Sequence, residues 1–183
     1  YPTREEGWMY SLTLPRVLTL RQGHIFSEPV HELKALRHRE TERTLEAEQT
    51  SHFETALFDL TELLLDIEVG DAYTVALELV YGAEKLVFRY NRLEQVMTID
   101  RTKMRQGGRG TRSFKLYVDR TLSLRIYVDH SAVEAFFQHG EEAASLFVFP
   151  EKEVCPELIL ESDAPMESVT GCVWELDAIR FDP

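Results

Sequence analysis

The stretch from Leu124 to Glu141, LRIYVDHSAVEAFFQHGE, limits more than any other what this chain can fold into. Apolar side chains recur at every second position on both sides of a short polar interval: Leu124, Ile126, Val128, Val133, Ala135 and Phe137. A period of two residues is typical of β-strands with one buried face. The stretch therefore predicts a β-hairpin that packs against a core.

The polar interval has the chemistry of a tight turn. Asp129 and Ser131 have short side chains that can hydrogen-bond to nearby backbone amides, which favours a reversal of the chain. Gly140 predicts the next reversal.

The same period continues over most of the chain, from about residue 39 to the C-terminus. We count roughly a dozen short candidate strands, at the spacing expected of a β-sandwich. The candidate strands in the C-terminal half of the chain centre on Phe114–Val118, Leu122–Val128, Ala132–Phe137, Ala144–Phe149, Leu158–Leu160 and Val169–Leu176. The expected fold class is all-β: a two-sheet antiparallel β-sandwich of the jelly-roll or lectin-like kind.

Two smaller zones precede the sandwich. In residues 1–26 the alternation around Leu12 and Leu14 predicts a strand, with too little apolar surface to fold alone. Residues 27–38 predict a helical linker, with Ser27 as N-cap, Pro29 in the first turn and a stripe formed by Val30, Leu33 and Leu36. The sandwich is expected over residues 39–183.

Charge and composition exclude several classes of partner. The chain has 32 acidic and 20 basic residues, a formal net charge of -12, so we expect no nucleic-acid partner. No apolar run approaches the roughly 18 residues of a membrane span, so we expect no membrane partner. The two cysteines, Cys155 and Cys172, lack framework spacing and fit a reduced intracellular protein, although one bridge between them stays open.

These residues closely resemble the C-terminal domain of glycoside hydrolase family 32, which comprises invertases, levanases and sucrose-6-phosphate hydrolases. The hairpin at Leu124–Glu141 is similar to a signature of that domain. The resemblance continues through Ser11–Arg16, Pro29–Leu33, Thr98–Arg101 and Val148–Pro150, in the order of the family.

The resemblance implies a division of labour. Residues 1–26 would be the remnant of the last strand of a catalytic five-bladed β-propeller that precedes this chain, and we interpret the chain as a piece of a longer protein. The family's catalytic carboxylates belong to WMNDPNG-like, RDP and EC motifs of the propeller, and the sequence contains none of these motifs. The resemblance therefore implies no catalytic residue here and no cofactor. It also implies a bacterial, cytoplasmic parent enzyme that hydrolyses sucrose, sucrose 6-phosphate or a fructan.

Two pairs of acidic residues that lie close together in the sequence are candidates for an independent catalytic site. Retaining glycosidases need two carboxyl groups roughly 5 to 5.5 Å apart. Asp129 with Glu134, or Asp66 with Glu68, have a spacing that could supply such a pair. Because an acidic chain contains many such spacings by composition, we interpret both pairs as solvent-facing strand and turn residues.

The histidines and the serine next to one of them do not predict a reactive centre. The six histidines, His24, His31, His38, His52, His130 and His139, lack the spacing of a zinc site, so no metal is expected. His130 and Ser131 are adjacent, and neighbouring strand residues point to opposite faces.

One basic segment stands out in the acidic chain. Arg101–Arg112, RTKMRQGGRGTR, combines cationic and glycine residues but lacks the phosphate-loop pattern. The simpler interpretation is a mobile hairpin loop with solvated charges. The alternative is an anion contact, or a contact with an acidic subunit neighbour, through Arg105 and Arg109.

The leading hypothesis makes this chain a non-catalytic domain that stabilises the propeller and contributes to a homo-oligomer. Loss of the propeller would then expose an apolar patch, which we expect around Trp8, Leu14 and the helical stripe. The alternatives are a stand-alone carbohydrate-binding module and a dimerisation module. A sugar platform needs exposed aromatics, whereas Trp174 alternates with Cys172 and Leu176 and is expected to be buried.

Overall fold

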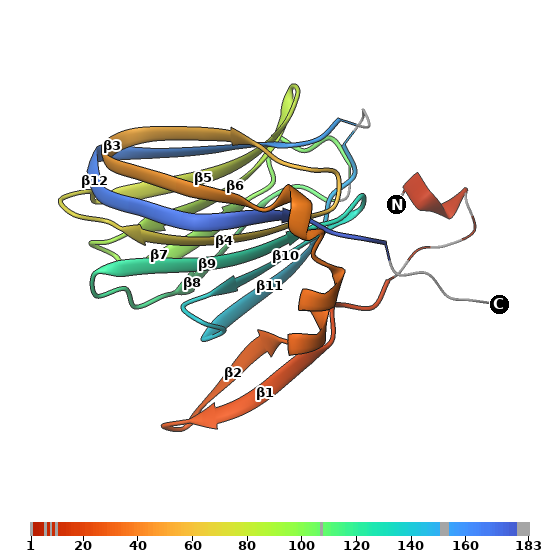
Figure 1. The fold of residues 1–183 in the computed structure, drawn as a ribbon, viewed down its shortest axis with the longest axis horizontal. Coiled ribbons are helices and arrows are strands. Elements are labelled where there is room, and N and C mark those ends of the chain that lie inside the picture. The colour runs from red at the N-terminus through yellow and green to blue at the C-terminus, as the bar shows by residue number, and fades with distance from the viewer. Residues whose placement is uncertain are drawn as a thin grey trace.

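The computed structural model describes residues 2–5, 7, 9, 11–106, 108–150 and 154–178. Within these residues a two-stranded sheet precedes a ten-stranded antiparallel sheet that curls into a sandwich (Figure 1). The 3-10 helices are η1 (Pro2–Arg4), η2 (His31–Leu36) and η3 (Arg39–Thr41). The strands are β1 (Arg16–Arg21), β2 (His24–Pro29), β3 (Arg43–Ala56), β4 (Thr61–Glu68), β5 (Thr74–Tyr81), β6 (Glu84–Asn91), β7 (Val96–Asp100), β8 (Thr111–Lys115), β9 (Thr121–Val128), β10 (Ala132–Phe137), β11 (Glu142–Phe147) and β12 (Glu157–Glu175).

Strand β12 divides the large sheet into two layers, because its halves pair with different neighbours. Residues 168–175 pair with β4, whereas residues 157–162 pair with β5. Strand β3 follows the other edge of β12 along both halves. The first layer continues from β4 through β9, β10 and β11, and the second layer continues from β5 through β6, β7 and β8.

The bend between the layers corrects one sequence-based prediction. The strands expected at Leu158–Leu160 and Val169–Leu176 are one strand, β12, whose pairing with β3 shifts register between Glu161 and Met166. Pro165 lies inside this shift. Proline has no backbone N–H, and a residue in such a bulge does not need one for the ladder of hydrogen bonds between the strands. The proline therefore marks a bulge in a continuous strand.

The sandwich core confirms the predicted alternation. Ile126 in β9 and Val133 and Ala135 in β10 have no exposed surface, and Leu124, Val128 and Phe137 are also buried. Asp129 accepts a hydrogen bond from the His130 N–H at 2.7 Å in the turn between these strands. Gly140 lies in the turn between β10 and β11, as predicted. The all-β sandwich is thereby confirmed.

The linker predicted over residues 27–38 differs in its first half. Ser27 is not an N-cap: it lies in β2 and pairs with Leu18 of β1. The helix η2 begins only at His31, is a 3-10 helix, and has Val30 as its N-cap residue. The chain can coil only after Pro29, because the residues before it are committed to the β1–β2 hairpin.

Membrane insertion through a helix finds no support in the described ranges. No helix there has both the length and the apolar character that crossing a bilayer requires.

Candidate functional site

The outer face of the first layer holds the N-terminal part of the chain. Tyr127 of β9 and Phe136 of β10 are buried on this face beneath Leu33 of η2. Around them pack Leu14, Val30, Leu36, Ala143 and Leu176. We call this second hydrophobic cluster the outer cluster. It confirms that the stripe predicted in the linker is apolar and packed, and it joins residues 14–36 to the sandwich.

A buried carboxylate fixes the end of the linker. Glu62 of β4 has no exposed side-chain surface and accepts two hydrogen bonds from Arg37, at 2.7 Å from Nε and 2.6 Å from Nη2. The Tyr127 hydroxyl donates to the same carboxylate at 2.9 Å. The guanidinium of Arg37 also lies 3.7 Å from the centre of the Trp174 ring. Because a buried charge is costly unless it is paired, this arrangement holds Arg37 firmly.

The electrostatics of this network are reflected in shifted pKa values. The hydrogen bond to Glu62 raises the pKa of Arg37 above its ordinary value. Burial, together with the negative charge of Glu62, raises the pKa of the Tyr127 hydroxyl. Both groups therefore stay protonated and continue to donate to Glu62 throughout the physiological pH range.

A second carboxylate fixes the start of the same segment. Glu134 of β10 is 8% exposed and accepts a hydrogen bond from the backbone N–H of Leu14 at 2.5 Å. Arg16 donates to Glu134 at 2.6 Å and to the Ser145 hydroxyl at 2.6 Å. The guanidinium of Arg16 lies 5.0 Å from the centre of the Phe136 ring. Residues 14–37 are thus held at both ends by charged groups of the first layer.

The β1–β2 hairpin lies beside the sandwich (Figure 1), and besides the Arg16 contacts it meets the turn between β10 and β11. The Ser27 N–H donates to the carbonyl oxygen of Gly140 at 2.7 Å. A Cβ atom on Gly140 would lie 2.6 Å from the Ser27 carbonyl oxygen, so only glycine permits this approach. The contact sets the position of the hairpin relative to the β10–β11 turn.

One face of this hairpin is apolar and open to solvent. Leu20 pairs directly with Ile25, and Leu18 is two residues from Leu20, so these three side chains share a face. Leu20 is 72% exposed, Ile25 is 64% exposed and Leu18 is 68% exposed. We call them the apolar hairpin face. Leu12, at 98%, adds to the exposed apolar surface of the N-terminal segment.

The apolar patch predicted around Trp8, Leu14 and the helical stripe is wrong for Leu14 and the stripe, and it stays a prediction for Trp8. Trp8 lies outside the described residues. Leu14 and the stripe are packed in the outer cluster rather than exposed. Leu18, Leu20 and Ile25 of the adjacent hairpin are exposed instead, because the apolar linker residues pack on the sandwich and these three side chains do not.

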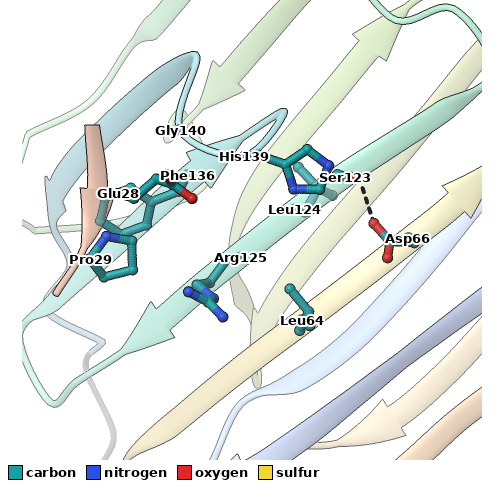
Figure 2. A pocket seen from close by; sticks show the side chains of 10 residues that line it. All are labelled: Glu28, Pro29, Leu64, Asp66, Ser123, Leu124, Arg125, Phe136, His139 and Gly140. Atoms are coloured by element: carbon teal, nitrogen blue, oxygen red, sulfur yellow. Dashed lines mark hydrogen bonds between the residues drawn. The ribbon is translucent and has the colours of Figure 1, made fainter. Parts of the chain in front are cut away.

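A pocket of about 200 Å³ lies where the hairpin, the first layer and the β10–β11 turn meet. Figure 2 shows Glu28, Pro29 and Phe136 on one side and Leu64, Asp66 and Ser123 on the other, with Arg125 between them. The Ser123 hydroxyl donates to Asp66 at 2.5 Å. His139 and Gly140 complete the rim. The pocket is mixed in character, with apolar walls and side chains of both charges.

The carboxylate pairs weighed in the sequence are engaged with separate partners. Glu134 holds Leu14 and Arg16, whereas Asp129 is an exposed turn residue. Asp66 accepts from Ser123, whereas Glu68 pairs with Arg120 at 3.2 Å. Each carboxylate thus has a structural explanation.

The remaining sequence candidates are dispersed. His130 contacts Asp59 at 2.7 Å and Asp129 at 3.2 Å, all of them exposed, and this cluster lies at the β9–β10 turn. The parts of the chain that the structure describes contain no group of three or more histidine, cysteine or acidic residues suited to a metal ion. Cys155 and Cys172 are free thiols, and Trp174 is buried as predicted.

The basic segment is partly anchored. Met104 is 1% exposed and packs in the hydrophobic core. The backbone N–H of Arg105 donates to the buried Glu84 at 2.7 Å. The side chains of Arg105 and Arg109 are exposed. The anion contact predicted for them stays a prediction.

The sequence does not reveal the two pairs that matter most at this face, Arg16 with Glu134 and Arg37 with Glu62, although it presents Glu134 as a candidate carboxylate. The partners are 25 and 118 positions apart, and no local pattern connects residues at such separations. The only local signal is that Glu134 lies within an otherwise apolar strand, VEAFF.

Comparison with known proteins supplies the wider context. A family model for the C-terminal region of glycosyl hydrolases of family 32 matches residues 32–174. The sucrose-6-phosphate hydrolase of Staphylococcus xylosus is 33% identical over 161 residues, which cover 83% of this chain and 32% of that protein. The Escherichia coli sucrose-6-phosphate hydrolase is 28% identical over 178 residues, which cover 96% of this chain and 36% of that protein.

Solved structures of family 32 enzymes also resemble this chain over a part of their length. Sucrose-6-phosphate hydrolase from Lactobacillus gasseri superposes with a TM-score of 0.78 at 25% identity, covering 98% of this chain and 36% of that one. Exo-inulinase from Aspergillus awamori, at 18% identity and a TM-score of 0.76, shares the fold. The chain spans about a third of the length of the curated relatives that it matches.

Proposed function

Since the chain belongs to the family of C-terminal domains of family 32 glycosyl hydrolases, we propose that it is the non-catalytic part of a β-fructofuranosidase and that it holds and completes a preceding catalytic propeller. Residues 1–26 then belong structurally to the last propeller blade, residues 27–38 form the linker, and residues 39–183 form the supporting sandwich. The parent enzyme would hydrolyse sucrose or sucrose 6-phosphate, as the names of the relatives indicate.

One observation carries this proposal: the N-terminal segment is fixed to the sandwich while its hairpin presents an open apolar face. Glu62 and Glu134 hold the two ends of residues 14–37. Leu18, Leu20 and Ile25 remain more than half exposed. A two-stranded hairpin is at best marginally stable alone, and an exposed apolar patch with a polar surround marks an interaction surface. The missing two thirds of the relatives' length offers the natural partner for it.

The absence of a catalytic arrangement in the sequence supports the same division. The chain carries none of the three propeller motifs, and the candidate carboxylates are engaged elsewhere. Bond cleavage therefore belongs to the propeller in this proposal. The sandwich contributes by positioning the last blade.

An activity assay tests the division of labour. The 183-residue chain should release no fructose from sucrose, whereas the complete enzyme with its propeller should. Release of fructose by the chain alone would refute the proposed non-catalytic role.

A matched pair of variants in the complete enzyme tests the role of the hairpin. Leu20→Asp introduces a charge into the apolar hairpin face and should lower the melting temperature of the catalytic domain and its activity. Leu93→Asp changes an equally exposed leucine, 76% exposed on the β6–β7 turn, and should leave both unchanged. Equal behaviour of the two variants would contradict the proposed interface.

Oligomerisation and cellular location are further parts of the proposal. We propose a bacterial cytoplasmic enzyme that forms a homo-oligomer, and sedimentation of the complete enzyme tests the latter. The unpaired edge of β3 does not favour edge-to-edge pairing, because it carries the exposed carboxylates of Glu46, Glu48 and Glu54. A stand-alone dimerisation module would require the 183-residue chain to dimerise without the propeller.

A further inference from the structure

We infer that the pocket between the hairpin and the first layer binds a single uncharged sugar ring. The inference does not depend on the function proposed above. It rests on the chemistry of the lining, on the size of the pocket and on the way its rim is held.

The lining offers both kinds of hydrogen-bonding group that a sugar hydroxyl needs. Arg125 and His139 can donate, whereas the carboxylates of Asp66 and Glu28 accept. A hydroxyl group donates and accepts at once, so a polyhydroxylated ligand can use both sets. Pro29 and Leu64 provide apolar walls for the C–H faces of a ring. Small-molecule sites commonly combine such walls with a few convergent polar groups.

Among the described residues, Arg125 has one ion pair and an Nε without a hydrogen bond. Its Nε lies 3.4 Å from Glu62, close enough for an ion pair, yet Nε is buried and forms no hydrogen bond within the described part of the chain. Glu62 is already occupied by Arg37 and Tyr127. Nε therefore faces Glu62 and not the pocket, whereas the side chain as a whole is 24% exposed, so the terminal Nη groups are the donors that a ligand in the pocket could use.

The signs of the charges argue against an anionic ligand. Asp66 and Glu28 line the same pocket as Arg125. Arg21 pairs with Glu28, and Glu62 pairs with Arg125. Of these lining charges, that of Asp66 is therefore the one without an ion pair in the described part of the chain, and it would repel a phosphate group. An uncharged ligand avoids this repulsion. The volume of about 200 Å³ is below the roughly 300–1,000 Å³ of pockets for drug-sized molecules, which fits one monosaccharide ring better than an oligosaccharide.

The rim is held rigidly at some cost to the backbone. Gln138 and His139 both have positive φ, 46° and 56°, in the left-handed region that non-glycine residues seldom adopt. The side chain of Gln138 locks the turn by accepting from the Ser123 N–H at 2.7 Å and donating to the Thr121 carbonyl at 3.1 Å. These hydrogen bonds keep His139 at the rim of the pocket.

Titration of the 183-residue chain with D-fructose, D-glucose and sucrose, followed by calorimetry, tests the inference. Saturable binding of at least one of them in the millimolar range is expected. His139→Gly suits the positive φ while removing the ring, and Asp66→Asn removes one charge. Each should weaken binding by about tenfold, as expected when a hydrogen bond to the ligand is lost. Leu64→Trp should abolish binding by filling the pocket.

Matched controls separate the pocket from the rest of the surface. Leu93→Trp and His52→Ala change exposed residues on the β6–β7 turn and on β3, and both should bind as the unchanged chain does. Urea unfolding of every variant checks that it folds. If Leu64→Trp does not fold, His139→Gly still tests the pocket. Three results would overturn the inference: no saturable binding of any sugar, binding that survives the pocket variants, or binding of inorganic phosphate that displaces the sugar.

Discussion

Glu62 shows how a single residue can decide whether a linker is part of a domain. A carboxylate without exposed surface is tolerated because Arg37 and Tyr127 satisfy it by hydrogen bonds and Arg125 adds a second positive charge. The Arg37 side chain reaches it from the end of the linker. The anchor is therefore both a stabilising pair and the place where the linker joins the sandwich.

Replacing Arg37 should be strongly destabilising. Arg37→Leu leaves the Glu62 charge buried with weaker partners and removes the stacking on Trp174, so we expect a loss of about 3–5 kcal/mol in the free energy of unfolding. Arg120→Leu is the control, because Arg120 pairs with Glu68 and Glu167 at the surface. It should cost less than about 1 kcal/mol. Urea unfolding of both variants measures the difference, and similar losses would refute a special role for the buried pair.

His130 should add a pH-dependent contribution at the β9–β10 turn. Burial lowers the pKa of its ring, but the carboxylates of Asp59 and Asp129 outweigh this effect and raise the pKa above its ordinary value. A raised folded-state pKa stabilises the protein fully below the unfolded pKa of about 6.5, and this stabilisation is lost as pH rises through the folded value.

The measurement compares the chain with His130→Gln between pH 5.5 and pH 8.5. The unchanged chain should have the higher urea midpoint at the acidic end, and the difference should vanish at the alkaline end. It should stay within the about 0–1 kcal/mol of exposed ion pairs, since His130 and Asp59 are mostly solvent-accessible. A difference that is constant with pH would refute the assignment.

At the scale of elements, the turn between β10 and β11 positions the hairpin. Gly140 and Gly23 have the same φ of 84°, but only Gly140 lies against another segment. Gly23→Ala should therefore cost only the backbone penalty of about 1–2 kcal/mol. Gly140→Ala meets Ser27 as well and should cost about 1–3 kcal/mol more.

Urea unfolding gives the two costs, and hydrogen exchange at the Ser27 amide shows whether the hairpin has separated from the turn. In Gly140→Ala this amide should lose protection, because its hydrogen bond to residue 140 is broken. In Gly23→Ala it should keep its protection. Equal losses of stability would mean that the close approach has no energetic weight.

The elements that could be predicted from the sequence are those whose partners are neighbours along the chain. The alternation from Leu124 to Phe137 predicts β9 and β10 because a hairpin buries every second residue. The bent strand β12 could not be recognised, since Pro165 is a typical strand breaker and only the two-layer arrangement accommodates it. The anchors of the outer face depend on distant pairs such as Arg16 with Glu134, which form only after the layers exist.

At the scale of the whole molecule, the contacts imply that the stable unit begins before the sandwich itself. The outer cluster, the Glu62 pair and the Glu134 pair all lie between the first layer and residues 14–37. Removing that segment would uncover Tyr127 and Phe136, take Arg16 from Glu134 and leave Glu62 with Arg125 as its cationic partner. The predicted boundary at residue 39 therefore divides the sequence, but it should not divide the folded unit.

Two truncated chains test this. A chain that begins at Ser11 keeps every one of these contacts and should unfold at the same urea concentration as the 183-residue chain. A chain that begins at Arg39 loses them and should be destabilised by more than the roughly 3–5 kcal/mol of one broken buried pair, with a tendency to aggregate through the uncovered aromatic face. Equal stability of the two would show that residues 14–37 only rest on the sandwich. A marked loss in the shorter chain alone would show that the sandwich and the linker fold together, as a support for a rigidly placed hairpin requires.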